Sequence, residues 1–267
     1  MVIFISTLII LAVLYFFVFL FPGNKHGREI HKDLLVNYAH RGLHTKEIPE
    51  NSLAAFKNAV NNGYGMELDV QLSRDGEVMV FHDYTLIRMT GDERKLSDLT
   101  ASELRELTLN GTDEKIPYLK EVLELVGGKV PLLIELKGES ADTALCPKVC
   151  EILDKYNGAY LIESFNPMLL AWFKKNRKDV LRGILTTKSC KERGLSPLNF
   201  LLDSMLLNVL SRPDFVAYDR RYKKFSVSAC KKLFSLPAFI WTVRKREELE
   251  GLPKDDHIIF EGFLAEK

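Results

Sequence analysis

Three carboxylates lie in two apolar stretches with the alternation of strands. Glu67 and Asp69 are two residues apart in GMELDVQL, and Glu135 belongs to PLLIELK. Because successive side chains of a strand point to opposite faces, Glu67 and Asp69 share a face. Carboxylates gathered in one water-poor site repel each other unless a cation neutralises them. Oxygen-only ligands favour Mg²⁺ or Ca²⁺, whereas zinc more often takes histidine or cysteine. The three residues therefore predict a site for one divalent cation.

Two histidines and two basic residues occupy similar positions at the ends of apolar runs. His40 and Arg41 stand in AHRG, His82 in FHD, and Lys137 two residues after Glu135. Imidazole titrates near neutrality, so a pair of histidines can supply one general base and one general acid. Arg41 and Lys137 can neutralise phosphoryl oxygens. These residue types suit the cleavage of a phosphodiester.

Each feature taken singly has an ordinary structural explanation. A histidine at a strand end is usually structural, a Glu-x-Asp pair is usually a solvated strand face, and PENS is usually a turn with a helix cap. Their joint placement at the ends of expected strands is what favours a functional site.

Expected strands and helices alternate from Lys32 onward. The patterns predict strands over residues 34–39, 65–72, 77–81, 131–136, 159–164, 180–185, 214–218, 238–243 and 257–260, separated by helices such as 52–61, 141–156, 167–176 and 226–234. About eight such units are typical of a (β/α)8 TIM barrel. Residues 83–117 are polar and predict a small insertion after the second strand unit. A doubly wound open sheet is the alternative, but AHRGLH is not the glycine-rich turn that it requires.

The first 21 residues are almost entirely apolar. Val2–Phe21 carries no charge, and about 20 apolar residues span a bilayer as a helix. We expect a transmembrane anchor over residues 1–23, a juxtamembrane linker over 24–34 and the barrel over 35–267. A signal peptide is the main alternative, but no basic residue precedes the run and no A-x-A site follows it; a buried core helix is another. Lys25, Arg28 and Lys32 favour a single-pass membrane protein whose catalytic domain faces the cytoplasm.

Charge and cysteine content narrow the function classes. The 267 residues have a formal net charge of +1, and no basic stripe interleaved with aromatics is present, so we expect no nucleic-acid partner. The four cysteines form no Cys-x-x-Cys pair, which favours reduced thiols over a metal or disulfide framework.

The chain resembles the glycerophosphodiester phosphodiesterase family from about residue 37 to 260. The resemblance rests on AHRG, PENS, ELDVQLSRDGEVMVFHD, LSDLTASELREL, IPYLKEVLE and LLIELK in this order, followed by ESFNP and IWTV. It implies a TIM barrel with the following site residues: His40 and His82 as the acid–base pair, Glu67, Asp69 and Glu135 on the metal, Arg41 and Lys137 on the phosphate, Trp241 against the glycerol or head group, and Asn51 and Glu50 at the mouth or supporting the metal ligands.

Two positions depart from the family pattern. Arg244 follows IWTV where the family has Asn, and Glu261 stands where the family has Asp. We expect both to bear on substrate detail rather than on catalysis. His44 and the remaining histidines, His26, His31 and His257, match no catalytic position, so we interpret them as loop or surface residues.

The sequence thus predicts a membrane-anchored, metal-dependent enzyme that hydrolyses glycerophosphodiesters to sn-glycerol 3-phosphate and an alcohol such as choline or ethanolamine. Attack by the glycerol 2-hydroxyl and attack by water both remain open. One alternative is a lysophospholipase D acting on lysophospholipids, with the apolar segment 195–210 against the acyl chain or the membrane. Another is a non-catalytic barrel that binds phosphorylated head groups, which the intact set of seven polar positions disfavours.

Overall fold

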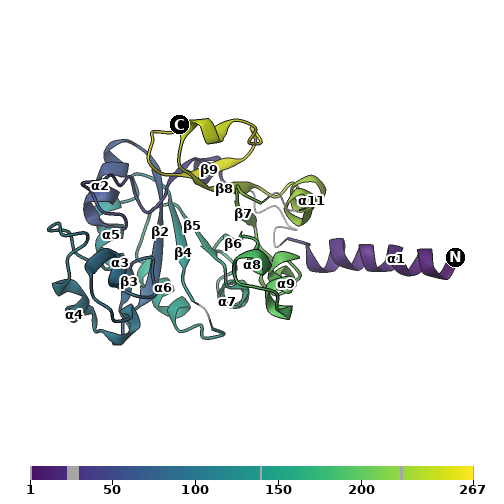
Figure 1. Cartoon of the computed structure of the whole chain (residues 1–267), viewed down its shortest axis with the longest axis horizontal. Helices are drawn as coiled ribbons and strands as arrows, with labels where there is room; N and C mark the ends of the chain where they lie inside the picture. Colours follow the sequence, from purple (N-terminus) through teal and green to yellow (C-terminus); the bar gives the residue numbers. More distant parts are fainter. Residues whose placement is uncertain (1, 23–29, 139, 223–224, 267) are drawn as a thin grey trace.

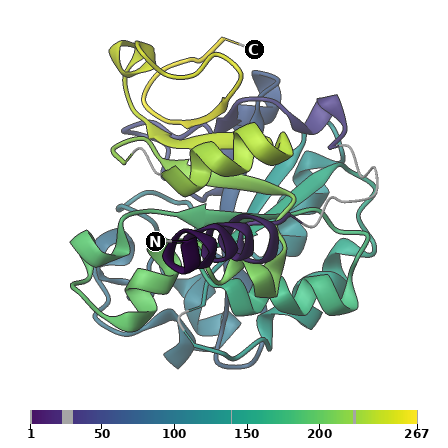
Figure 2. The same ribbon diagram turned by 90° about the vertical axis from the view of Figure 1, so that its right-hand side faces the viewer.

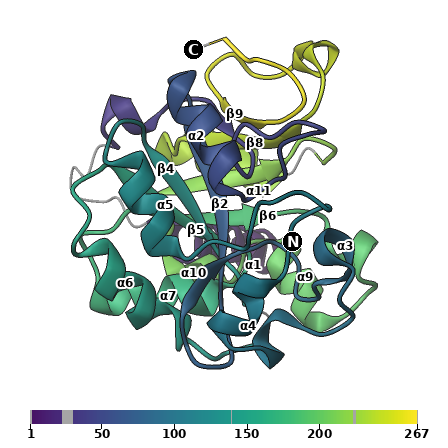
Figure 3. The same ribbon diagram turned by 90° about the vertical axis from the view of Figure 1, so that its left-hand side faces the viewer.

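The chain folds into a closed barrel of parallel strands, shown in Figures 1 and 3. The computed structural model describes residues 2–22, 30–138, 140–222 and 225–266. Within these residues, eight strands pair in parallel around the barrel and the last pairs with the first. They are β1 (Tyr38–Ala39), β2 (Gly65–Leu72), β4 (Leu132–Leu136), β5 (Tyr160–Ser164), β6 (Arg182–Thr186), β7 (Phe215–Asp219), β8 (Ala238–Val243) and β9 (His257–Phe260). The TIM-barrel prediction is confirmed, and the open-sheet alternative is excluded because β9 returns to β1.

Helices follow the strands and cover the outside of the barrel (Figures 1 and 3). They are α2 (Leu53–Asn61), α5 (Leu119–Val126), α6 (Leu145–Leu153), α7 (Pro167–Asn176), α8 (Ser189–Glu192), α9 (Pro197–Asp203), α10 (Asn208–Ser211), α11 (Phe225–Phe234) and the 3₁₀ turn η4 (Arg246–Leu249). Ser52 caps α2 by accepting a hydrogen bond from the Ala55 amide, and Asn166 caps α7 directly before Pro167. These capping residues explain why both helices begin where they do.

One expected strand is not part of the barrel. Val78–Val80 forms β3, which pairs antiparallel with β2 because the turn at residues 73–77 folds the chain back. The insertion that follows contains α3 (Ile87–Thr90), the 3₁₀ turn η3 (Leu96–Asp98) and α4 (Ala101–Glu106). It packs with β3 around its own apolar cluster, which includes Met79, Leu86 and Leu104.

The register of the strands positions the polar side chains. Leu133 and Glu135 lie two apart on β4 and therefore share a face, and Leu133 packs with Phe215 and Phe239 in a second apolar cluster. Glu67 pairs with Leu133, and Asp69 pairs with Glu135 on the neighbouring strand. The carboxylates thus follow apolar side chains toward the C-terminal ends of the strands, where the active sites of such barrels lie.

The prediction of a transmembrane anchor is wrong. The regular α-helix α1 covers only Val2–Leu14, and Tyr15–Phe19 forms a π-helical segment, η1, that packs against α10 and α11. Thirteen residues at 1.5 Å per residue span only about 20 Å, short of the roughly 30 Å of a bilayer core. Among the described residues, no helix is both long and apolar enough to cross a membrane. The predictions of a membrane anchor and of a single-pass localisation are therefore not supported.

The N-terminal helix nevertheless has an unusual surface. α1 projects from the barrel, and Figure 2 views it nearly end-on. Its apolar side chains are exposed, among them Phe4, Ile9 and Leu11. Leu20, at the barrel end of the segment, is fully buried. The linker predicted over residues 24–34 lies partly outside the described residues, including Lys25 and Arg28.

Candidate active site

Three buried carboxylates meet at the C-terminal end of the barrel. Glu67, Asp69 and Glu135 each place an oxygen within 4.8 Å of the others. Burial and the charges of Asp69 and Glu135 raise the pKa of Glu67 well above its usual range. Burial, with the charge of Asp69, also raises the pKa of Glu135. The predicted metal ligands therefore lie together, and their mutual repulsion favours a bound cation.

Two basic side chains stand against this cluster. Lys137 Nζ lies 2.9 Å from Glu135 Oε1 and 3.3 Å from Asp69 Oδ1, and Arg41 Nε lies 3.4 Å from Asp69 Oδ2. Burial alone would raise the pKa of Asp69, but the charges of Lys137, His82 and Arg41 outweigh it and hold that pKa well below its usual range. The backbone amide of Arg41 also donates to Glu67 Oε2 at 2.9 Å.

The donor set fits a hard divalent cation. All three ligands are carboxylate oxygens, the type preferred by Mg²⁺ and Ca²⁺. Asp69 Oδ1 is buried and lacks a hydrogen-bond partner despite the nearby ammonium group of Lys137. The raised pKa values of Glu67 and Glu135 indicate that the basic side chains alone do not compensate the cluster. These residues can hold one divalent cation, and nothing in their chemistry separates magnesium from calcium.

Each predicted acid–base histidine has a carboxylate at Nδ1. His40 Nδ1 lies 2.5 Å from Glu261 Oε2, and His82 Nδ1 lies 2.6 Å from Asp83 Oδ1. A carboxylate at Nδ1 favours the tautomer with its proton there, which leaves Nε2 to exchange a proton. His40 Nε2 lies 4.0 Å from Glu67 Oε2, beside the carboxylate cluster. Burial lowers the pKa of His40 to about 4, although Glu261 opposes this shift.

The PENS turn supports the same cluster. Asn51 Nδ2 donates to Asp69 Oδ2 at 2.9 Å, and the Asn51 backbone amide donates to the Arg41 carbonyl. Glu50 accepts a hydrogen bond from Arg41 at 2.6 Å. Asn51 therefore contacts a candidate metal ligand, as expected, and Glu50 fixes the guanidinium group of Arg41.

Trp241, predicted to contact the glycerol or head group, lies on β8. Its ring packs edge-on against Phe165, with centroids 5.5 Å apart. Phe165 lines the cleft beside the carboxylates, and Trp241 is absent from the described lining residues. The head-group contact predicted for Trp241 remains a prediction.

Three residues that contact His40 or its carboxylate partner were not assigned to the site from the sequence. Glu261 contacts His40 directly and Arg244 binds Glu261 at 2.7 Å, so the two departures from the family pattern form one ion pair beside a candidate catalytic histidine. His44, interpreted as a loop or surface residue, faces the same carboxylate from 3.6 Å. The signal available was the position of Glu261 directly after the last strand. His31 is exposed as expected, and His26 lies outside the described residues. His257 is not a loop residue: it begins β9, is half-buried and packs on Phe239.

Glu163 is a fourth buried carboxylate. It lies on β5, where it pairs with Glu135 of the neighbouring strand β4, and its Oε2 has no hydrogen-bond partner. Burial and the charges of Glu135 and Asp69 raise its pKa well above the usual range. A neutral Glu163 would add no charge to the cluster.

A cleft of about 840 Å³ opens from the site. His82, Glu135 and Lys137 line its polar end. Its other end is lined by the apolar side chains Phe165, Met168, Leu198, Leu202, Leu207 and Leu210. The cleft thus joins a charged centre to an apolar trough formed by α9, α10 and the chain between them.

Fold and site together define an enzyme built on a (β/α)8 barrel, with its polar centre at the C-terminal ends of the strands. The chain belongs to the glycerophosphoryl diester phosphodiesterase family, whose model matches residues 40–257. The predicted class of enzyme is thereby confirmed.

Individual relatives agree with this assignment. A glycerophosphodiester phosphodiesterase of Caldanaerobacter subterraneus is 34% identical and aligns with 81% of this chain and 88% of its own. A human lysophospholipase D is 32% identical over 76% of this chain and 63% of its own length. Among solved structures, a glycerophosphodiester phosphodiesterase of Thermotoga maritima has a TM-score of 0.66 at 29% identity, covering 88% of this chain and 96% of that one. The fold is also that of a phosphodiesterase of Oleispira antarctica, solved in complex with the product sn-glycerol-3-phosphate, with a TM-score of 0.72 at 23% identity over 86% of this chain and 94% of that one.

Proposed function

We propose that the protein hydrolyses glycerophosphodiesters to sn-glycerol 3-phosphate and an alcohol, with one divalent cation, Mg²⁺ or Ca²⁺, held by Glu67, Asp69 and Glu135. One observation carries the proposal. At one end of the barrel, these carboxylates lie beside Lys137, Arg41 and two histidines that are each bonded to a carboxylate. When bound, the cation supplies a Lewis acid that neutralises charge on the phosphoryl group.

The chain's own residues divide the remaining work. Arg41 and Lys137 bind the phosphoryl oxygens, and Glu50 and Asn51 hold the turn that carries Arg41 in place. His40 and His82 exchange protons through Nε2, one with the attacking oxygen and one with the leaving alkoxide. Their Nδ1 atoms stay bonded to Glu261 and Asp83, which keeps both rings oriented.

Two routes satisfy this arrangement. Attack by the glycerol 2-hydroxyl forms a cyclic phosphate that water then opens, whereas attack by water gives the product in one step. Both need one base and one acid, so both use the same pair of histidines.

Assays of the full chain with glycerophosphocholine and glycerophosphoethanolamine test the proposal. Release of glycerol 3-phosphate in Mg²⁺ or Ca²⁺ should stop with EDTA and in Glu67→Gln. His40→Ala and His82→Ala should each lower kcat by about a hundredfold or more. Circular dichroism must show the variants folded. Parental rates in both folded histidine variants would refute the assigned roles.

A lysophospholipid is the second candidate substrate, and the apolar trough supports it. Leu198 and Leu202 lie in the same cleft as His82 and Lys137, so a phosphate at the polar end would direct an attached acyl chain along the leucines. Burial of each methylene of such a chain would contribute about 0.8 kcal/mol. The lysophospholipase D activity in the name of the human relative is compatible with this direction.

Leu198→Gln separates the two substrates. Leu198 lines the cleft but is 58% exposed, so the substitution should leave the fold intact. We expect a severalfold higher KM for lysophosphatidylcholine and an unchanged rate with glycerophosphocholine. Leu195→Gln is the matched control, because Leu195 is 92% exposed and is not a lining residue of the described cleft. Turnover of glycerophosphocholine without turnover of lysophospholipid in the parent would exclude this candidate.

A further inference from the structure

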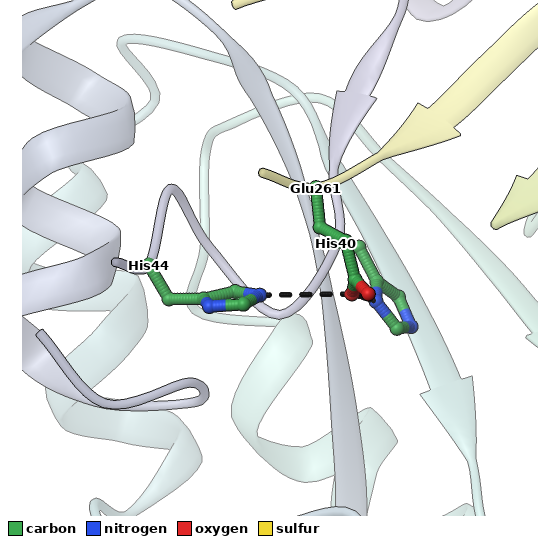
Figure 4. A group of neighbouring side chains, drawn as sticks. All are labelled: His40, His44 and Glu261. Carbon is green, nitrogen blue, oxygen red and sulfur yellow. Dashed lines mark hydrogen bonds and ion pairs between the residues drawn. The ribbon is translucent and has the colours of Figure 1, made fainter. Parts of the chain in front are cut away.

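A second group of metal-ligating side chains lies beside His40, on the side of Nδ1. It combines His40 after β1, His44 in the loop before α2, and Glu261 after β9 (Figure 4). Each offers one ligand atom within 4.8 Å of the others. Glu261 Oε2 lies 2.5 Å from His40 Nδ1 and 3.6 Å from His44 Nε2, so the carboxylate stands between the rings.

The donor chemistry of this group differs from that of the carboxylate cluster. Two imidazoles and one carboxylate form a ligand set typical of Zn²⁺, which leaves a fourth position for water. The oxygen-only set of Glu67, Asp69 and Glu135 suits Mg²⁺ or Ca²⁺ instead. The two neighbouring groups would therefore select different metals.

His44 gives an independent indication that this group is incomplete. Its Nε2 is buried and lacks a hydrogen-bond partner. The ring points toward Glu261 in Figure 4, yet at 3.6 Å it is too far for a hydrogen bond. A metal ion between the rings would satisfy this nitrogen.

Arg244 is the competing charge. Its Nε binds Glu261 Oε1 at 2.7 Å, while the histidines face Oε2. A metal would therefore have one carboxylate oxygen available and would bind Glu261 through that oxygen alone. Its entry would release the proton that His40 Nδ1 donates to Glu261.

We propose that His40, His44 and Glu261 form a Zn²⁺ site whose occupation inhibits the enzyme. Zinc on Nδ1 withdraws electron density from the His40 ring and replaces its hydrogen bond to Glu261. The ring can then no longer exchange a proton through Nε2 as the reaction requires. The inhibition rests on the role proposed for His40 above, whereas the binding of zinc does not.

Zinc titration of the full chain tests this site by two separate readouts. Calorimetry with saturating Mg²⁺ should reveal one Zn²⁺ per chain, and its affinity should fall at least about tenfold in His44→Ala. In the assay, zinc should inhibit the parent, and His44→Ala should need at least about tenfold more zinc to halve its own zinc-free rate. His31→Ala, which removes an exposed histidine, is the matched control and should behave like the parent.

Other outcomes overturn the proposal. Equal zinc affinity in parent and His44→Ala would exclude the site. Inhibition that excess Mg²⁺ relieves, and that His44→Ala does not change, would place zinc on the carboxylate cluster instead. If the chain lacks phosphodiesterase activity, calorimetry still decides whether the zinc site exists, so the two proposals fail separately.

Discussion

At the scale of single residues, the site is organised by pairs rather than by isolated side chains. His40 has Glu261 at Nδ1 and His82 has Asp83, while Asp83 in turn accepts a hydrogen bond from Arg88. A carboxylate so placed fixes both the tautomer and the orientation of the ring. Glu261 is therefore a positioning residue, since its effect on the substrate passes through His40.

Glu261→Gln should lower kcat by about tenfold to a hundredfold and leave KM nearly unchanged. The neutral amide orients the His40 ring less well, and Glu261 is not a lining residue of the described substrate cleft. Steady-state kinetics on glycerophosphocholine would measure this split.

Arg244→Gln is the comparison for this variant. It keeps the carboxylate but removes the ion pair at Oε1, so we expect a smaller loss of kcat. A KM effect in Glu261→Gln without a kcat effect would mean that Glu261 acts on substrate binding instead.

At the scale of elements, caps and strand periodicity fix most of the local structure. Thr100 caps α4 by accepting from the Glu103 amide, and the Glu103 side chain accepts from the Thr100 amide in return. This capping box satisfies two amides at the helix start that have no partner within the helix.

Thr100→Ala should lower the free energy of unfolding by about 1 kcal/mol. The substitution removes one side of the capping box, and α4 belongs to the insertion rather than to the described cleft, so activity should be unchanged. Urea unfolding would measure the loss. Ser102→Ala is the control, because Ser102 is exposed in the same turn and, although its hydroxyl lies 3.0 Å from Thr100 Oγ1, the substitution leaves both hydrogen bonds of the capping box in place. A loss in Ser102→Ala as large as in Thr100→Ala would contradict the capping role.

Elements with strong local signals were predicted well from the sequence. The strands 65–72, 238–243 and 257–260 and the helix 167–176 have the expected bounds because alternation, or Asn166 with Pro167, marks them locally. The expected strand over 34–39 shrinks to Tyr38–Ala39, since Lys32–Leu34 forms the 3₁₀ turn η2. β3 had the pattern of a strand, but the pattern does not state which strand it joins or in which direction.

The parts of the site that lie close together along the chain were also easier to predict than those that lie far apart. Glu67, Asp69 and Glu135 were grouped correctly because their positions along two strands imply a shared end of the barrel. The contact between His40 and Glu261 joins residues 221 positions apart, and only barrel closure brings them together. No pattern local to either residue contains this contact.

At the scale of the whole molecule, the apolar N-terminal segment lies in two different environments. Leu20 is buried against the barrel, and its carbonyl oxygen lies 3.9 Å from Cys230 Sγ. Many apolar side chains of α1, by contrast, are exposed. Hydropathy alone gives both halves the same character, which is why the sequence suggested one continuous span. The regular helix ends at Leu14, and the η1 segment after it packs against α10 and α11, a contact that a hydropathy profile does not contain.

The burial of the thiols gives a test of the packing as a whole. Cys146, Cys150 and Cys230 are buried, Cys190 is half-buried, and none of the four forms a disulfide. Burial raises the pKa of Cys146 and Cys230 to about 12 and also raises the pKa of Cys150. A thiol is nucleophilic only as the thiolate, so at pH 8 a pKa of about 12 leaves roughly one molecule in ten thousand reactive.

In the native protein at pH 8, we therefore expect Ellman's reagent to modify Cys190 first and the other three thiols far more slowly. Raising the pH toward 10 should increase the slow rates, because the thiolate fraction grows with pH while it lies below the raised pKa. The readout is the number of fast-reacting thiols, and Cys190→Ser should abolish the fast phase. All four should react at once in guanidinium chloride, where burial is lost. Fast modification of Cys230 in the native protein would contradict the packing of Leu20 against this buried thiol of α11.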